Sequence, residues 1–166
     1  RRDLVRKLEE MSYHDQLTQL GNRYAMKECL KNLQEDQSLG IVYCDITGLK
    51  QVNDRDGHSF GDKLITDACD CLKKSFGKYG LFRIGGDELL AICIQIDESE
   101  LWQKIEQLKQ DLRSKSIHMA IGGLWERNSL GGVDRLISEA EKKMYSDKAA
   151  YYMKFSVDRR HAADLH

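Results

Sequence analysis

The 166-residue sequence contains no proline and carries almost no net charge, because 26 lysines and arginines are balanced by 27 aspartates and glutamates. A near-neutral chain argues against binding nucleic-acid polymers through a broad positive field. Long hydrophobic runs are missing too: segments such as 40–44 and 89–96 are far shorter than the roughly 20 residues of a membrane-spanning helix. No apolar signal-peptide core follows the charged start. We therefore expect one cytoplasmic domain that contacts neither nucleic-acid polymers nor membranes.

The cysteines form no pattern that indicates a metal or redox site. There are five, an odd number, and none belongs to a Cys-x-x-Cys pair. Cys69 and Cys71 are close in sequence, but no histidine nearby completes a zinc site. We interpret all five as small buried or neutral side chains in a reducing compartment, so cysteine catalysis is not expected.

Hydrophobic spacing indicates strands that alternate with helices. Helices are predicted over residues 3–13, 24–34, 59–76, 99–114 and 132–151, and strands over residues 39–44, 80–84, 89–96 and 117–125. This order, with one hairpin, predicts an α/β (α+β) sandwich in which helices flank a central mixed, mainly antiparallel sheet. The polar tail from Phe155 to His166 lacks helical periodicity, so we expect an edge strand followed by a disordered end.

The first helix has an apolar face and no start signal. Leu4, Leu8 and Met11 recur at helical spacing, and no capping residue precedes them. We interpret this helix as the end of a connector from an upstream domain.

A carboxylate follows a buried strand at Asp45, and a loop with Gly48 and Lys50 comes next. Ligands of open α/β folds bind at the carboxyl ends of strands. Backbone N–H groups of a glycine-containing turn can hold phosphate oxygens, with a lysine as the cationic partner. Taken alone, the segment is equally consistent with a surface aspartate in a strand-to-helix loop.

The next segment, 51–62, is rich in amide and carboxylate groups. Asn53 offers both a donor and an acceptor, and Asp62 accepts hydrogen bonds, which together suit the edge of a guanine base. The Asp54-x-Asp56-Gly57 run resembles part of a calcium loop, but the terminal bidentate glutamate is missing. We therefore do not expect an EF-hand.

A third segment places two carboxylates after a glycine pair. Gly85 and Gly86 between two strands suit a tight turn, which in most proteins is purely structural. Asp87 and Glu88 follow at once, and a hairpin that brought Asp87 near Asp45 would surround a divalent ion with acidic oxygens.

At this point the sequence resembles a known family. The run Gly85-Gly86-Asp87-Glu88-Leu89 resembles the GGDEF signature of diguanylate cyclases. Three other motifs support the resemblance: Asp15-x-Leu17-Thr18-x-Leu20-x-Asn22-Arg23, Asp45-Ile46 with Lys50-x-x-Asn53-Asp54-x-x-Gly57-His58-x-x-Gly61-Asp62, and Ala140-x-x-x-Met144-Tyr145-x-x-Lys148. They occur in the right order between residues 12 and 152.

The resemblance implies a fold similar to the nucleotidyl cyclases and polymerase palms. It implies that two GTP molecules are condensed into cyclic di-GMP with release of two pyrophosphates, by a homodimer in which each domain brings one GTP. It also implies an upstream sensory domain. We expect a connector helix over residues 1–12, a GGDEF domain over residues 13–157 and a disordered tail over residues 158–166.

The same resemblance implies roles for individual residues. The Mg²⁺ (or Mn²⁺) ligands would be Asp45, the carbonyl of Ile46 and Asp87. The catalytic acids would be Asp87, which would activate the ribose 3′-hydroxyl, and Glu88. Guanine would be bound by Asn53 and Asp62, with His58 lining the pocket. The triphosphate would be held by the N–H groups of Gly48 and Leu49 and by Lys50 and Lys148.

Four positions and one segment depart from the family pattern. Thr47 replaces the second acid of an Asp-x-Asp pair, Leu49 and Leu89 replace phenylalanines, and Tyr152 replaces an arginine. The product-inhibition motif would fall on residues 76–79 and is absent there, so feedback at that site is not expected. These departures leave a second interpretation open, in which a degenerate domain binds GTP or a protein partner without forming product.

Overall fold

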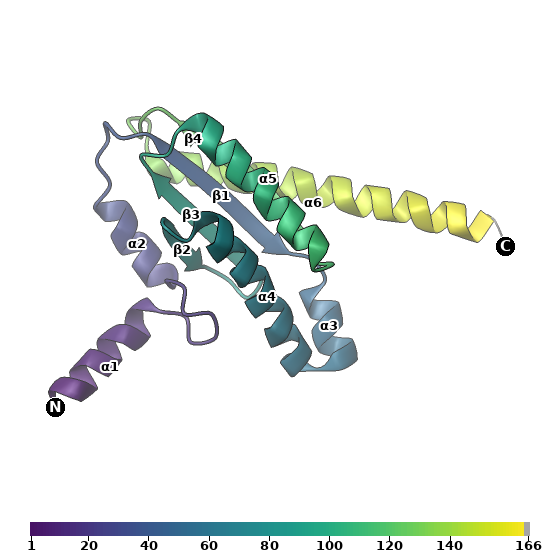
Figure 1. Cartoon of the computed structure of the whole chain (residues 1–166), viewed down its shortest axis with the longest axis horizontal. Coiled ribbons are helices and arrows are strands. Elements are labelled where there is room, and N and C mark those ends of the chain that lie inside the picture. The colour runs from purple at the N-terminus through teal and green to yellow at the C-terminus, as the bar shows by residue number, and fades with distance from the viewer. Residues whose placement is uncertain (165–166) are drawn as a thin grey trace.

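The computed structural model describes the backbone of residues 1–164 and their side chains except those of residues 9–11, 157–159 and 161–164. Its helices are α1 (Arg2–Tyr13), α2 (Arg23–Lys31), α3 (Leu49–Asp56), α4 (His58–Phe76), α5 (Glu98–Ser114) and α6 (Val133–Asp164). Its strands are β1 (Leu39–Ile46), β2 (Gly80–Arg83), β3 (Glu88–Ile94) and β4 (Met119–Glu126). The strands form one sheet in the order β2-β3-β1-β4 (Figure 1).

The central strand β1 is buried along its whole length, because helices cover both faces of the sheet. Val42 and Cys44 belong to a core that α4 and α5 complete on one face. Ile41 and Tyr43 belong to a second core, completed by α2 and α6 on the other face. This alternation is the period-two pattern of a strand that packs on both sides. The polar end of β1 is thereby held in a rigid layered frame.

Helix α6 crosses the sheet at very close range. Ala140 and Met144 are fully buried, and a Cβ atom at Gly122 of β4 would overlap the backbone of α6 at both positions. Farther along α6, a carboxylate oxygen of Asp147 accepts a hydrogen bond of 2.8 Å from the backbone N–H of Ile121. Gly122 and this bond therefore fix how α6 lies on the sheet.

The predicted, mainly antiparallel sheet and most predicted elements are present. The pairings of β1 with β3, β1 with β4 and β2 with β3 are antiparallel. Among the described residues, parallel pairing occurs at an isolated bridge between Gly21 and Phe82. The N-terminal loop thus joins the outer edge of β2 without adding a full strand.

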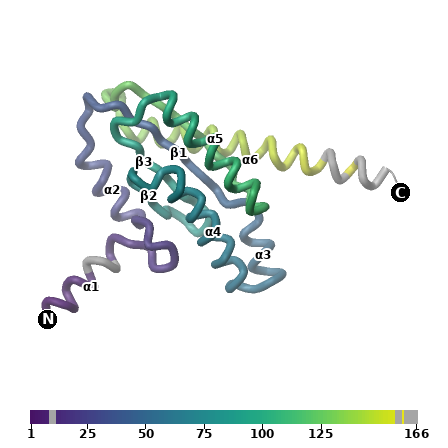
Figure 2. Tube along the Cα trace, viewed as in Figure 1, coloured from purple at the N-terminus to yellow at the C-terminus, as the bar shows by residue number. Residues whose placement is uncertain are grey.

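The prediction of a strand after Phe155 was wrong. Helix α6 continues to Asp164, and Figures 1 and 2 show it running past the end of the sheet. Polar residues are compatible with a helix that leaves the core, because no apolar face is then required. The disordered tail predicted for residues 158–166 begins inside this helix, and residues 165 and 166 lie outside the described part.

The sequence pattern also missed α3. This helix has no fully buried residue, so its sequence carries no apolar period. Glycines delimit it: Gly48, with φ +80°, precedes its first turn, and Gly57, with φ +90°, separates it from α4. Among the described residues, no helix combines the length and apolar character that a membrane crossing requires.

Candidate active site

Three carboxylates meet where β1 and β3 end. Asp45 lies directly opposite Glu88 in the antiparallel register, and Asp87 precedes Glu88 at the hairpin. One ligand oxygen from each of the three lies within 4.8 Å of the others. Ile46 links the strands further, because its N–H donates a 2.8 Å hydrogen bond to the carbonyl of Asp87. The sheet register therefore brings together residues that are about 40 positions apart in sequence.

The electrostatics of this cluster favour a cation. Burial raises the pKa of Asp45, and the neighbouring charge of Asp87 raises it further, while Lys148 opposes both effects. The ammonium group of Lys148 lies 3.4 Å from a carboxylate oxygen of Asp45, which is only 4% exposed. Clustered carboxylate oxygens are the ligands that Mg²⁺ and Mn²⁺ prefer. The donor set therefore fits a divalent ion.

The turn after β1 presents backbone N–H groups beside the acidic cluster. Gly48 adopts a left-handed conformation and leads directly into α3, so the N–H groups at the start of α3 lack partners within that helix. Lys50 is exposed in the first turn of α3. Just before the turn, the N–H of Thr47 donates a 3.0 Å hydrogen bond to the carbonyl of His118, which restrains the backbone there. This arrangement suits phosphate oxygens.

Helices α3 and α4 form a helical hairpin around Gly57, and three polar side chains lie on it. Asn53, on α3, abuts Gly61, on α4, so closely that a Cβ atom at Gly61 would overlap the side-chain amide oxygen. His58 and Asp62 are exposed in the first turns of α4. The absence of a side chain at Gly61 thus leaves room for Asn53 between the helices.

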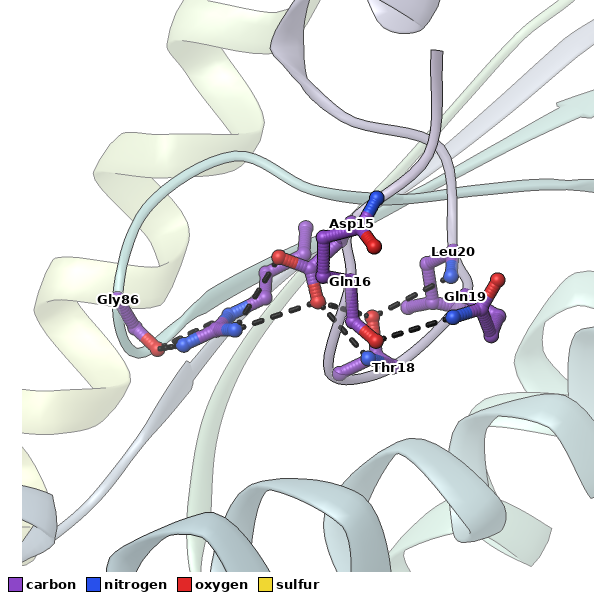
Figure 3. A network of polar contacts seen from close by, with 7 residues as sticks. Asp15, Gln16, Thr18, Gln19, Leu20 and Gly86 are labelled. Carbon is purple, nitrogen blue, oxygen red and sulfur yellow. Dashed lines mark hydrogen bonds and ion pairs between the residues drawn. The ribbon is translucent and has the colours of Figure 1, made fainter. Parts of the chain in front are cut away.

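The hairpin that carries Asp87 is braced by a polar network from the N-terminal loop (Figure 3). Arg83 donates to the carbonyl of Gly86 at 2.9 Å and contacts both carboxylate oxygens of Asp15 at 3.2 Å. Thr18 donates its N–H and its hydroxyl to Asp15 at 2.9 and 2.7 Å. Burial alone would raise the pKa of Asp15, but these hydrogen bonds and the charge of Arg83 together lower it.

We predict that Arg83→Lys lowers the free energy of unfolding by about 1 to 3 kcal/mol. A lysine can keep an ion pair with Asp15, but it lacks the planar fork that also reaches Gly86, and hydrogen bonds from a charged donor contribute about that amount. Urea unfolding followed by circular dichroism would measure the change. Arg113→Lys, at an exposed position on α5, is the matched control. A loss no larger than that of the control would contradict a bracing role.

The departures from the family pattern occupy distinct surroundings. Thr47 Oγ1 lies 2.7 Å from Nδ1 of His118, whose ring stacks on Tyr151 with centroids 3.7 Å apart. Leu89 is fully buried in the core beneath α4 and α5, whereas Tyr152 is 41% exposed on α6. Thr47 therefore links the end of β1 to α6 through His118.

Sequence reasoning left Arg83 and Tyr43 without roles. The Asp15-x-Leu17-Thr18 motif was a signal for the brace, because Asp15 needs a basic partner. Nothing in the sequence indicated a polar role for Tyr43, because it lies among the apolar residues of a buried strand. Its hydroxyl donates to a carboxylate oxygen of Glu88 at 3.0 Å.

Comparison with known proteins agrees with this geometry. Residues 12–154 match the model of the family described as diguanylate cyclase, GGDEF domain. The chain is 32% identical over 114 residues to the cyclic di-GMP phosphodiesterase PdeR of Escherichia coli K12, which covers 64% of this chain and 17% of PdeR. It is 28% identical over 156 residues to the diguanylate cyclase DgcS of Shewanella oneidensis, covering 86% of this chain and 52% of DgcS. The chain thus spans about half or less of these relatives.

Solved structures share the fold. The diguanylate cyclase SiaD of Pseudomonas aeruginosa, in complex with its activator SiaC, superposes with a TM-score of 0.75 at 25% identity, over 90% of this chain and 63% of SiaD. The coiled coil and GGDEF domain of DgcB from Caulobacter crescentus superposes with a TM-score of 0.78 at 20% identity, over 90% of this chain and 87% of that one. The chain therefore belongs to the GGDEF family of diguanylate cyclase domains.

Proposed function

We propose that this chain is a diguanylate cyclase domain that condenses two GTP molecules into cyclic di-GMP and two pyrophosphates. The observation that carries the proposal is the acidic cluster of Asp45, Asp87 and Glu88 at the strand ends of a GGDEF domain. Phosphoryl transfer needs positioning and charge neutralisation more than covalent chemistry from the protein. Clustered carboxylates beside a phosphate-binding turn suit that requirement.

The metal ligands in this proposal are Asp45, Asp87 and the carbonyl of Ile46. A Mg²⁺ or Mn²⁺ ion bound there would neutralise charge on the transferring phosphate. Asp87 accepts the proton of the ribose 3′-hydroxyl as that oxygen attacks in line, and Glu88 supports this as the second acid. Lys148 lies 3.4 Å from Asp45 and balances negative charge of the cluster. In this proposal it also supplies positive charge to the triphosphate.

The substrate contacts follow from the turn and the helical hairpin. The N–H groups of Gly48 and Leu49 hold phosphate oxygens, and Lys50 and Lys148 supply positive charge. The guanine base lies against the hairpin, where Asn53 and Asp62 bind its edge and His58 lines the pocket. Guanine presents ring and exocyclic N–H donors, and a carboxylate at position 62 accepts them.

Because one domain binds one GTP, the reaction needs two domains that face each other. We propose a homodimer, which an upstream sensory domain controls through α1. The exposure of Leu4, Val5 and Leu8 on α1 supports this arrangement, since an apolar stripe on a helix favours pairing with another helix. Activity should therefore rise with protein concentration.

The direct test is to incubate the purified chain at high concentration with GTP and Mg²⁺ and to separate the nucleotides by chromatography. We expect cyclic di-GMP, and more of it when a dimeric coiled coil is fused ahead of α1. Absence of product from a fused dimer that binds GTP would overturn the proposal. It would favour a degenerate regulatory module, which the substitutions at Thr47, Leu89 and Tyr152 motivate as the second candidate.

We predict that Gly61→Ala raises KM for GTP by about 2- to 12-fold with little change in kcat. The new methyl group would displace the side chain of Asn53 from its place against Gly61, and one lost hydrogen bond is worth about 0.5 to 1.5 kcal/mol. Steady-state kinetics at varied GTP would measure the effect. Ser59→Ala, at an exposed position two residues earlier on α4, is the control. An unchanged KM would contradict guanine binding by Asn53.

A further inference from the structure

Tyr43 is buried directly beneath the acidic cluster. It lies two residues before Asp45 on β1, so both side chains point to the face of the sheet that α6 covers. Its side chain is 3% exposed, and its hydroxyl donates a 3.0 Å hydrogen bond to Oε2 of Glu88. Two of the three clustered acids thus have one polar partner each: Asp45 has Lys148, and Glu88 has Tyr43.

The carboxylate of Glu88 is the acceptor that the structure gives this hydroxyl. Burial raises the pKa of Tyr43, and the neighbouring carboxylates of Glu141 and Glu88 raise it further. The hydroxyl has one proton to donate, and Glu88 receives it.

We propose that Tyr43 is a positioning residue for Glu88. This inference rests on the metal site of the proposed function and adds Glu88, the third acid of the cluster, to its ligands. The hydrogen bond to Oε2 restrains the carboxylate and leaves Oε1 for a divalent ion. Tyr43 does not touch the ion or the substrate.

Groups that orient metal ligands contribute about 10- to 100-fold to metal affinity. We therefore expect Tyr43→Phe to weaken Mn²⁺ binding by about tenfold. The phenylalanine ring fills the same space, so the core between β1 and α6 is retained.

The experiment measures free Mn²⁺ by electron paramagnetic resonance during titration of the whole chain, without nucleotide. The unchanged chain is compared with Tyr43→Phe, a substitution that leaves the charge near the site unchanged. Tyr24→Phe removes an exposed hydroxyl on α2 and serves as the control. Thermal unfolding monitors the folded state of each variant.

A tenfold loss of Mn²⁺ affinity in Tyr43→Phe, absent in Tyr24→Phe, is the expected result. Mn²⁺ affinity within twofold of the unchanged chain in a folded Tyr43→Phe variant would overturn the inference. If the unchanged chain binds Mn²⁺ but forms no cyclic di-GMP, the proposed function fails while the role of Tyr43 stands. If it binds no Mn²⁺ even with GTP, both fail.

Discussion

Replacing Asp87 with asparagine should lower the rate of cyclic di-GMP formation by at least about 100-fold. Removing a group that only orients a metal ligand costs about 10- to 100-fold, so removing a ligand that is also the proposed proton acceptor should cost at least the upper value. The rate is measured with the chain held as a dimer and with GTP and Mg²⁺ in excess. Under these conditions, weaker dimerisation cannot be mistaken for lost chemistry.

The folded state should survive this substitution. Asp87 lies in the hairpin turn, and its carbonyl, which asparagine retains, is the group that accepts the hydrogen bond from Ile46. Asparagine is nearly isosteric with aspartate and removes one of three mutually repelling charges. The matched control is Asp70→Asn, at an exposed position on α4, which should keep full activity. An Asp87→Asn variant that retained more than a tenth of the activity would contradict the assigned role.

Local sequence patterns were sufficient for most of the fold. The strands at 39–44, 80–84 and 89–96 were visible because buried strands produce short apolar runs, and the long helices because one face of each is apolar. Hydrophobic patterns did not predict the segments whose structure does not depend on burial. Helix α3 contributes polar side chains to a surface and is delimited by glycine conformations, and the end of α6 leaves the core altogether.

The candidate site was likewise predicted only in part from the sequence. Asp45, Asp87 and Glu88 carry charge at strand ends, so their residue types alone indicated chemistry, and the antiparallel register then brings them together. The groups that hold them were not visible. Tyr43 resembles an ordinary core residue, and its partner Glu88 is 45 positions away. The antiparallel register of β1 and β3 creates that contact, and no local pattern encodes it.

The approach of α6 to Gly122 leads to a further prediction on stability. Gly122→Ala should lower the free energy of unfolding by about 1 to 3 kcal/mol, since an added methyl group in a packed contact costs about that much. The methyl group would meet the carbonyl oxygen of Ala140 and the amide nitrogen of Met144, and backbone atoms of a helix cannot turn aside as side chains do. Thermal unfolding should show a Tm lowered by roughly 2 to 4 °C per kcal/mol for a chain of this size.

Gly123→Ala is the control for this prediction, because the two glycines are neighbours on β4 with different surroundings. A Cβ atom at Gly123 would lie 2.6 Å from a methyl group of Ile105 and 2.8 Å from the ring of Trp102, and both side chains can shift. We therefore expect the smaller loss there. Gly122→Ala should also move Lys148 away from Asp45, because both Lys148 and the contact belong to α6, and so weaken Mn²⁺–GTP binding more than Gly123→Ala does. Equal losses of stability and binding in the two variants would mean that α6 is not held to the sheet by its contact with Gly122.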